Sequence, residues 1–151
     1  MYEKVSTNLN FVEREKKVEQ FWKDNDIFRK SMENRKEGPT YTFYDGPPTA
    51  NGKPHIGHVL TRVIKDMIPR YRTMKGYMVP RKAGWDTHGL PVELEVEKLL
   101  GLDGKEQIEE YGLDPFIDKC KESVWKYKGM WEDFSGTVGF WADMDDPYVT
   151  Y

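Results

Sequence analysis

The residues best suited to phosphate chemistry are three histidines, which lie in two short segments of the 151-residue chain. His55 and His58 occur in His-Ile-Gly-His, directly after a turn rich in Gly and Pro at residues 46–54, and His88 lies in Gly-Trp-Asp-Thr-His-Gly-Leu-Pro at residues 84–91. A strongly helical pattern begins within the first motif. A helix N-terminus offers unpaired backbone N–H groups and a partial positive charge, and the imidazoles add donors beside it. The arrangement predicts a nucleotide-phosphate site, where phosphoryl transfer needs mainly positioning and charge stabilisation.

The first motif has two other interpretations. Gly52-Lys53 is superficially similar to a P-loop, but the spacing between the glycines is one residue too long, and Pro54 stands where the metal-binding Ser or Thr belongs. The second alternative is a pair of surface histidines at a helix start. Gly57 leaves room for an adenine ring or ribose, and Ile56 is expected to anchor the helix in the core.

Asp86 is the second candidate for chemistry. It follows Gly84-Trp85 just beyond an expected strand. Ligands of open α/β sheets bind outside the carboxyl ends of the strands, so this carboxylate is suited to pairing with a substrate ammonium, and Trp85 to forming an apolar wall. The alternative for Asp86 is a helix cap or a turn residue.

Composition limits the class of protein. The net charge is -3, and no run approaches the roughly 18 to 20 apolar residues that a membrane span needs. The N-terminal residues lack the layout of a signal peptide, so we expect a cytoplasmic protein without a membrane partner. Cys120 is the only cysteine, which excludes an internal disulfide or a cysteine-based zinc site within the chain, and we expect it in the core.

Charge is unevenly distributed. Residues 53–82 carry eight Lys and Arg against one acid, whereas residues 86–146 carry six Lys against sixteen acids. A basic stripe beside the histidine motif favours a phosphate ligand, and a solvated helix face is the alternative.

Apolar spacing, capping residues and breakers predict the order of elements. The elements are a helix over 10–31 capped by Asn10 and Glu13, a strand over 41–44, a helix from 56 with a kink or early end at Pro69 and a stop at Gly76, a strand over 77–79, a helix over 90–101, a short helix to Gly112 capped by Asp103 and Glu106, and a long helix from 114 to 134. Phe11, Val18, Phe21 and Trp22 give the first helix one apolar side. In the last helix an apolar stripe predicts a packing face, formed by Ile117, Cys120, Val124, Tyr127, Trp131 and Phe134. Residues 136–151 give no clear prediction.

The strand–helix–strand order predicts an α/β protein with a parallel sheet and a right-handed crossover. Two clear strands are too few for a complete doubly wound sheet. The chain is therefore expected to be the first part of a larger, incomplete domain.

Three runs, over residues 43–58, 66–77 and 84–93, together resemble the N-terminal part of a class I aminoacyl-tRNA synthetase, and within that class the isoleucyl-tRNA synthetases. The tetrapeptide His-Ile-Gly-His, the HIGH motif, is a weak signal alone. Its combination with the upstream Gly/Pro loop and the downstream Gly-Trp-Asp-Thr-His-Gly-Leu-Pro is very specific. The resemblance extends over essentially the whole chain and implies the HIGH-motif half of a Rossmann-like parallel sheet with an N-terminal helical extension.

The resemblance also implies a domain organisation. It places the helical extension at 1–40, the first half of the catalytic domain at 41–145, and the start of a connection toward an editing insertion at 146–151.

The implied activity is that of an isoleucine–tRNA ligase. Isoleucine and ATP with Mg²⁺ give isoleucyl-adenylate and pyrophosphate, and the isoleucyl group then passes to the terminal ribose of tRNA(Ile). By motif matching, the catalytic and ATP-binding residues are His55, His58, Gly57 and Lys53. The aminoacyl-adenylate pocket would comprise Gly46, Pro47, Pro48, Trp85, Asp86 and His88, of which Asp86 would hold the isoleucine ammonium and His88 would support the pocket.

The chain also departs from the family pattern. The second signature, Lys-Met-Ser-Lys-Ser, does not occur in it, and the editing and anticodon-binding regions and the family's zinc sites lie outside it. No metal ligand set is expected here. We expect the longer protein to be a monomer, and this chain alone to be inactive or very weak and to self-associate through the stripe of its last long helix.

Two alternatives from other classes are the small nucleotidyltransferases, which carry a similar His-x-Gly-His motif, and a non-catalytic nucleotide- or partner-binding module. The former begin almost at the first strand, whereas this chain has a helical preface of about forty residues and the Asp86 segment. Amino-acid-dependent chemistry discriminates all three.

Overall fold

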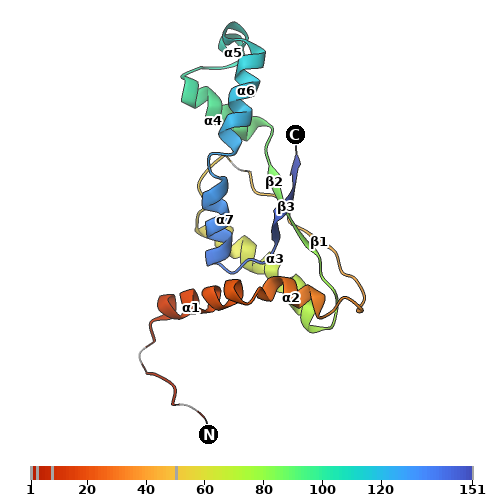
Figure 1. Cartoon of the computed structure of the whole chain (residues 1–151). Helices are drawn as coiled ribbons and strands as arrows, with labels where there is room; N and C mark the ends of the chain where they lie inside the picture. The colour runs from red at the N-terminus through yellow and green to blue at the C-terminus, as the bar shows by residue number, and fades with distance from the viewer. Residues whose placement is uncertain (1, 3, 8, 50, 151) are drawn as a thin grey trace.

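The computed structural model describes residues 2, 4–7, 9–49 and 51–150. Its centre is a three-stranded parallel sheet in the order β1-β2-β3, in which β1 spans Phe43–Tyr44, β2 spans Arg81–Asp86 and β3 spans Asp143–Thr150 (Figure 1). The predicted α/β class and parallel pairing are confirmed. Residues 146–150, expected to begin a connection, belong to β3 and therefore to the sheet.

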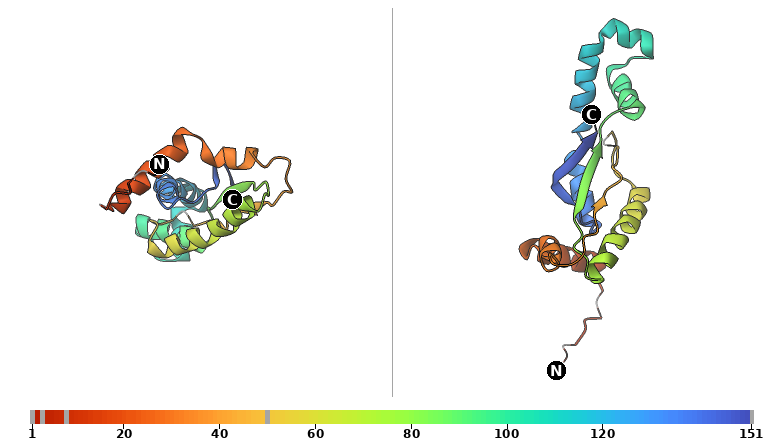
Figure 2. Two further views of the ribbon diagram at one scale, coloured as in Figure 1. Left: turned by 90° about the horizontal axis from the view of Figure 1, so that it is seen from below. Right: turned by 90° about the vertical axis from the view of Figure 1, so that its right-hand side faces the viewer.

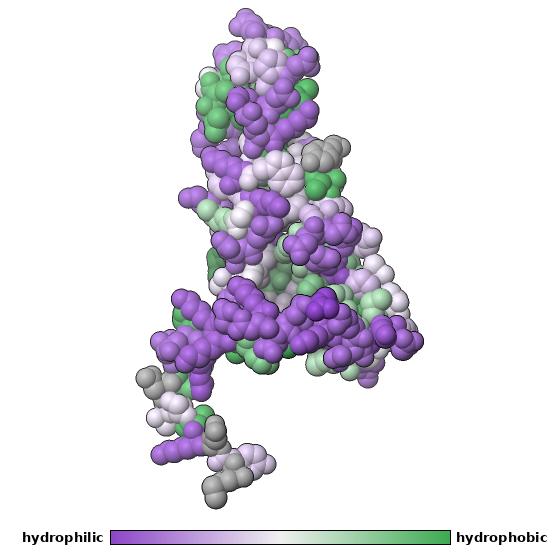
Figure 3. All heavy atoms as spheres, in the orientation of Figure 1, coloured by the Kyte–Doolittle hydropathy of each residue, from purple (hydrophilic) through white to green (hydrophobic). Residues whose placement is uncertain are grey.

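The described residues also form seven helices: α1 (Phe11–Asp24), α2 (Ile27–Glu33), α3 (Ile56–Met74), α4 (Leu90–Leu100), α5 (Lys105–Tyr111), α6 (Leu113–Val124) and α7 (Lys128–Thr137). In Figures 1 and 2, α4, α5 and α6 extend beyond the carboxyl end of β2, and α1 and α2 cross the opposite end. Figure 3 shows that the outer surface of α1 and α2 is mainly hydrophilic. The molecule is consequently elongated rather than layered on both sides of the sheet.

The predicted helix over 10–31 is two helices. Asn10 caps α1 by accepting a hydrogen bond from Glu13 N at 3.2 Å, as expected. The break follows Asp24, and Asp26 adopts a left-handed φ of 50°, which ends the helical path. The apolar side of α1 is not buried, since Phe11, Val18 and Phe21 are exposed, although Trp22 packs edge-on to Trp141 at 5.1 Å.

The second strand lies later than predicted. Residues 77–79 contribute only an isolated bridge between Thr40 and Met78, and β2 begins after Pro80. The position of β2 was not predicted, because its first residues, Arg81 and Lys82, are charged and charged residues rarely begin a buried strand. Arg81 is nevertheless only 2% exposed. β1 is shorter than the predicted strand over 41–44, and its Tyr44 is exposed.

The predicted long helix over 114–134 is broken between α6 and α7 at residues 125–127. Its stripe is still a packing face near the break, because Val124 and Trp131 are buried in one cluster with Trp85 and Val92, against which Cys120 packs. The outer end of the stripe is exposed at Ile117. The short helix α5 is confirmed, but its N-cap is Gly104 rather than Asp103.

The helix after the histidine motif runs through Pro69 to Met74, and Gly76 follows it with a φ of +92°, as expected for a glycine stop. Its apolar stripe does not face the core. Ile56 is 83% exposed, and the exposed residues continue along one side of the helix through Leu60, Val63, Ile64, Met67, Ile68, Tyr71 and Met74. The buried residues of α3 are Arg62, Asp66, Pro69 and Thr73.

None of the helices in the described part of the chain combines the length and apolar character of a membrane span.

Candidate functional site

His55 and His58 cap α3 by reciprocal hydrogen bonds. His55 Nδ1 accepts from Gly57 N at 3.1 Å, and His58 Nδ1 accepts from His55 N at 3.0 Å. A ring nitrogen that accepts a hydrogen bond carries no proton, so each neutral imidazole carries its proton on Nε2. The pair therefore presents two N–H donors, one on each ring, and the rings lie 3.8 Å apart.

Because of this capping, the groups that can donate hydrogen bonds to a phosphate differ from the backbone amides that the sequence predicts. The expectation of free amides at the start of α3 is not met at two positions, because Gly57 N is held by His55 Nδ1 and His58 N donates to His55 O at 2.8 Å. The imidazole Nε2–H groups are therefore donors that this end of α3 offers in place of those two amides. Gly57 has a related role: a Cβ built there would lie 3.0 Å from the His55 ring, so the glycine makes room for the capping imidazole.

The Gly/Pro turn and the start of α3 enclose a pocket of about 280 Å³. Its lining residues are Gly46, Pro47, Pro48, Thr49, His58, Thr61, Arg62, Lys65 and Trp131. Four of the predicted site residues thus lie together: Gly46, Pro47, Pro48 and His58. The pocket is open on one side and lined by two cationic side chains, which suits an anionic ligand.

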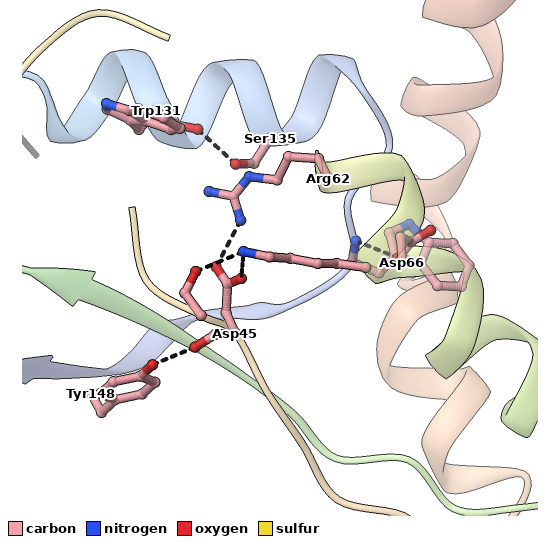
Figure 4. Close-up of polar contacts among 9 residues, drawn as sticks. Asp45, Arg62, Asp66, Trp131, Ser135 and Tyr148 are labelled. Atoms are coloured by element: carbon pink, nitrogen blue, oxygen red, sulfur yellow. Dashed lines mark hydrogen bonds and ion pairs between the residues drawn. The ribbon is translucent and has the colours of Figure 1, made fainter. Parts of the chain in front are cut away.

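Asp45 is the centre of a buried ion network behind the turn (Figure 4). Its carboxylate accepts from Arg62 Nη1 at 2.8 Å and from Lys65 Nζ at 2.9 Å, and Lys65 Nζ also donates to Gly46 O at 2.7 Å. Tyr148 of β3 donates its hydroxyl to Asp45 O. The network ties β1, α3 and β3 to the first residue of the turn, so the backbone at Gly46 is fixed from three elements.

A second network lies one and two turns further along α3. Asp66 pairs with Arg70 and accepts from Trp141 N at 3.1 Å, while Arg70 stacks on Trp141 at 3.9 Å. Arg81 lies 3.7 Å from Asp66, and burial lowers the pKa of its guanidinium to about 10. Most of the predicted basic stripe is therefore engaged within the fold, and only Arg62 and Lys65 of these cations line the pocket.

Trp131 joins α7 to this pocket. Its Nε1 donates to Gly52 O at 2.8 Å, and its ring meets the His58 ring edge-on at 4.7 Å. Burial is the main cause that lowers the pKa of His58, followed by the nearby charges of His55, Arg62 and Lys65. The lowered pKa favours the neutral form of His58, whose Nδ1 is engaged and whose Nε2 has no hydrogen-bond partner among the described residues.

Asp86 and His88 form a second group at the carboxyl end of β2. His88 Nδ1 lies 2.9 Å from Thr150 Oγ1 and 3.7 Å from Asp86 Oδ1, and Thr150 Oγ1 lies 3.3 Å from Asp86 Oδ1. Asp86 N donates to Pro48 O at 3.1 Å, which places the aspartate beside the end of the turn. Asp86 therefore adjoins the pocket through the backbone.

The remaining predicted residues lie elsewhere. Trp85 is 2% exposed and packs in the core with Val92, Val124 and Trp131, so it does not line this pocket. Lys53 is exposed beside the motif. His88 lines a separate, larger pocket of about 450 Å³ with residues of α4, α5 and α6.

Sequence reasoning missed Asp45, Arg62, Lys65, Trp131 and Thr150. Arg62 and Lys65 follow His58 at helical spacings of four and seven, which was a readable signal for one shared helix face. The apolar spacing predicts a packing role for Trp131, and no local pattern indicates its bond to Gly52. Among the described residues, no group of three or more His, Cys, Asp and Glu side chains is arranged to hold a metal ion.

The chain is similar to isoleucine–tRNA ligases over its whole length. It is 64% identical over 151 residues to those of Clostridium novyi and Clostridium kluyveri, and 57% identical over 148 residues to isoleucine–tRNA ligase 2 of Bacillus cereus. The three matches include 100%, 100% and 98% of this chain, respectively. They include only 14%, 15% and 14% of the three relatives. The chain thus spans about one seventh of the length of these relatives.

A solved structure confirms the fold. The chain matches the leucyl-tRNA synthetase of Agrobacterium radiobacter K84, solved in a ternary complex with tRNA and LeuAMS, with a TM-score of 0.65 and 20% identity, over 95% of this chain and 16% of that one. The family model for tRNA synthetases class I (I, L, M and V) matches residues 17–151. With its HIGH-type cap, its parallel sheet and this match, the chain belongs to the class I tRNA synthetases.

Proposed function

We propose that the chain supplies the HIGH-motif half of the ATP and aminoacyl-adenylate site of an isoleucine–tRNA ligase. The longer protein would activate isoleucine with ATP and transfer it to tRNA(Ile). The choice of isoleucine rests on the 64% identity to isoleucine–tRNA ligases. The observation that carries the proposed site is the reciprocal histidine cap, which engages Nδ1 of both rings and leaves each Nε2 available as a donor, beside a pocket lined by His58 and two cationic side chains.

The proposed chemistry is attack by the isoleucine carboxylate on the α-phosphorus of ATP, with pyrophosphate leaving. Nε2–H of His55 and of His58 would donate to α-phosphate oxygens as charge develops on them. Lys65 and Arg62 are committed to Asp45, so their positive charge would act on the phosphates over a longer range.

The amino acid would lie toward the carboxyl end of β2. Asp86 would accept the isoleucine ammonium, and His88 and Thr150, which contact or approach its carboxylate, would orient it. Gly46, Pro47 and Pro48 would contact the adenylate, and Lys53 and Gly57 would complete the ATP side. Mg²⁺ is proposed to enter as part of the nucleotide substrate.

Further parts of the proposal concern the longer protein. The division into an extension over 1–40 and a catalytic half from 41 onward, a cytoplasmic location and a monomeric state remain proposals. The relatives are about seven times longer than this chain, so isoleucine activation by the chain alone is expected to be weak at most.

Calorimetric binding to the 151-residue chain tests the proposal. The probes are the sulfamoyl analogues of isoleucyl-, valyl- and leucyl-adenylate, which replace the reactive phosphate by a stable group. We expect the isoleucyl analogue to bind most tightly, and His58→Ala to weaken it by about ten-fold or more, as for a lost hydrogen bond to a charged group. Equal binding of all three analogues, unaffected by His58→Ala, would overturn the proposal.

A further inference from the structure

We propose that Trp131 is a positioning residue for the adenylate site, holding both His58 and the Gly/Pro turn in place from α7. The inference rests on the proposed function of the His58 pocket. It assigns a site role to a residue that lies 79 positions from Gly52 of the turn, in a helix whose apolar spacing otherwise predicts only packing.

The geometry around Trp131 links it to two separate parts of the motif. The Nε1–H donates to Gly52 O at 2.8 Å, within the turn, while the ring contacts the His58 imidazole at 4.7 Å with an interplanar angle of 63°. The Arg62 guanidinium lies 5.7 Å from the same ring. One side chain therefore fixes the turn, the histidine and a cation that lines the pocket.

His58 is consequently restrained on several sides. The His55 ring stacks on it at 3.8 Å, the Trp131 ring meets it edge-on, and its Nδ1 accepts from His55 N. A ring flip would break that hydrogen bond and move the indole contact. These restraints fix the orientation of the His58 ring, and with it the direction in which its Nε2–H group can donate a hydrogen bond.

Trp85 shows that burial alone does not create such a link. Both indoles are 2% exposed and share one cluster, but Trp85 Nε1 is buried without a hydrogen-bond acceptor among the described residues. Trp131 Nε1 has an acceptor, and that acceptor belongs to the turn of the site. The difference separates a packing indole from a positioning one.

Two substitutions separate the hydrogen bond from the ring. Trp131→Phe keeps an aromatic ring beside His58 and removes the donor to Gly52, whereas Trp131→Leu removes both. Trp125→Phe, at the half-exposed end of α6, is the matched control. Each variant of the 151-residue chain is studied by ¹⁵N NMR, which reports the backbone amides of residues 51–58 and the titration of His58, and by calorimetry with the isoleucyl-adenylate sulfamoyl analogue.

For Trp131→Phe we expect shifted amide resonances over 51–58 and about five-fold weaker analogue binding, as for one lost hydrogen bond. For Trp131→Leu we also expect the pKa of His58 to rise toward its ordinary value, because the ring that buries the imidazole is lost. The titratable and cationic groups that face His58, namely His55, Arg62 and Lys65, are the same in all variants.

The inference is overturned if Trp131→Phe changes neither the loop amides nor the affinity more than Trp125→Phe does. Its failure is distinguishable from that of the proposed function. If the wild-type chain binds no analogue while the Trp131 variants still shift the loop amides and His58, the proposed function fails and the positioning role stands. If Trp131→Leu fails to fold, Trp131→Phe alone decides the outcome.

Discussion

The two faces of α3 show the reverse of the usual burial pattern, because the polar face is buried and the apolar face is exposed. The face toward the rest of the chain buries Arg62, Asp66 and Thr73 at 4%, 8% and 8% exposure, whereas the opposite face leaves Leu60 and Met67 more than half exposed. Apolar residues normally line the inner face of a surface helix. The comparison shows that polar contacts hold α3 to this part of the fold and that its apolar face is left uncovered within it.

The buried face serves the site rather than the core. Its ion pairs fix Asp45 and Gly46, which begin the turn of the pocket. Buried ion pairs are weak evidence for stability, because the cost of desolvation offsets their attraction, but breaking one partner leaves a buried charge uncompensated. We therefore expect substitutions on this face to be costly and substitutions on the apolar face to be mild.

The largest expected effect is that of Asp45→Ala. It leaves Arg62, which is 4% exposed, buried without its counter-ion, and we expect the free energy of unfolding to fall by about 3–5 kcal/mol. Urea denaturation measures it. Glu109→Ala, which removes the exposed pair with Lys105, is the control with an expected loss below about 1 kcal/mol. Equal losses in the two variants would remove the distinction between the faces.

A smaller effect is expected for Tyr148→Phe. It removes only the hydroxyl that donates to Asp45 O, so the free energy of unfolding should fall by about 1 kcal/mol. Thermal denaturation measures the change, and Tyr111→Phe, on α5, controls for the chemistry of the substitution. A loss as large as that of Asp45→Ala would show that the hydroxyl, rather than the ion pairs, holds the network together.

The histidine cap predicts a pH dependence. The pKa of His58 is lowered from 6.5 in the folded chain, chiefly by burial. The unfolded chain therefore takes up a proton at this residue before the folded chain does, and the stabilising contribution is full above about pH 6.5 and is lost as the pH falls through the lower folded pKa. Denaturation between pH 7.5 and pH 5 should show a steeper loss for the wild type than for His58→Asn, and parallel curves would contradict the prediction.

The smallest effect on stability is expected on the apolar face of α3. Leu60→Lys should change the free energy of unfolding by about 0.5 kcal/mol or less, since Leu60 is 64% exposed. The same change should reduce self-association of the isolated chain, which we now expect through α3 rather than through α6. Sedimentation should give 17.8 kDa for the variant and a larger mass for the wild type. Leu99→Lys, at another exposed leucine, is the control, and an unchanged mass for Leu60→Lys would exclude this face.

The sequence predicted what short-range patterns determine. The α/β class, the parallel pairing, the start of α3 and the glycine stop at Gly76 follow from local spacing and from residue types with few alternatives. The third strand escaped prediction because its acids and its proline mask any alternation, as Asp143–Thr150 shows. The inverted faces of α3 escaped because periodicity reveals that a helix has an apolar side but not what covers that side.

The candidate site was likewise predictable only where its residues lie close together in the sequence. Residue types and spacing predict His55, His58 and Asp86 as candidates, and the resemblance adds Gly46, because all four lie in contiguous motifs. Trp131 and Tyr148 reach the site from α7 and β3, and only the three-dimensional arrangement brings them there. Trp85 lies within a motif but packs in the core, so membership in a motif did not guarantee a place in the pocket.

The most direct test of the central claim observes the two imidazoles themselves. The ring ¹⁵N resonances of His55 and His58 are recorded for the 151-residue chain before and after addition of the isoleucyl-adenylate sulfamoyl analogue. Both rings should show Nε2–H tautomers at neutral pH, and both Nε2–H resonances should shift on binding and exchange more slowly with water. Nδ1–H tautomers, or Nε2–H resonances that a bound analogue leaves unchanged, would contradict the account.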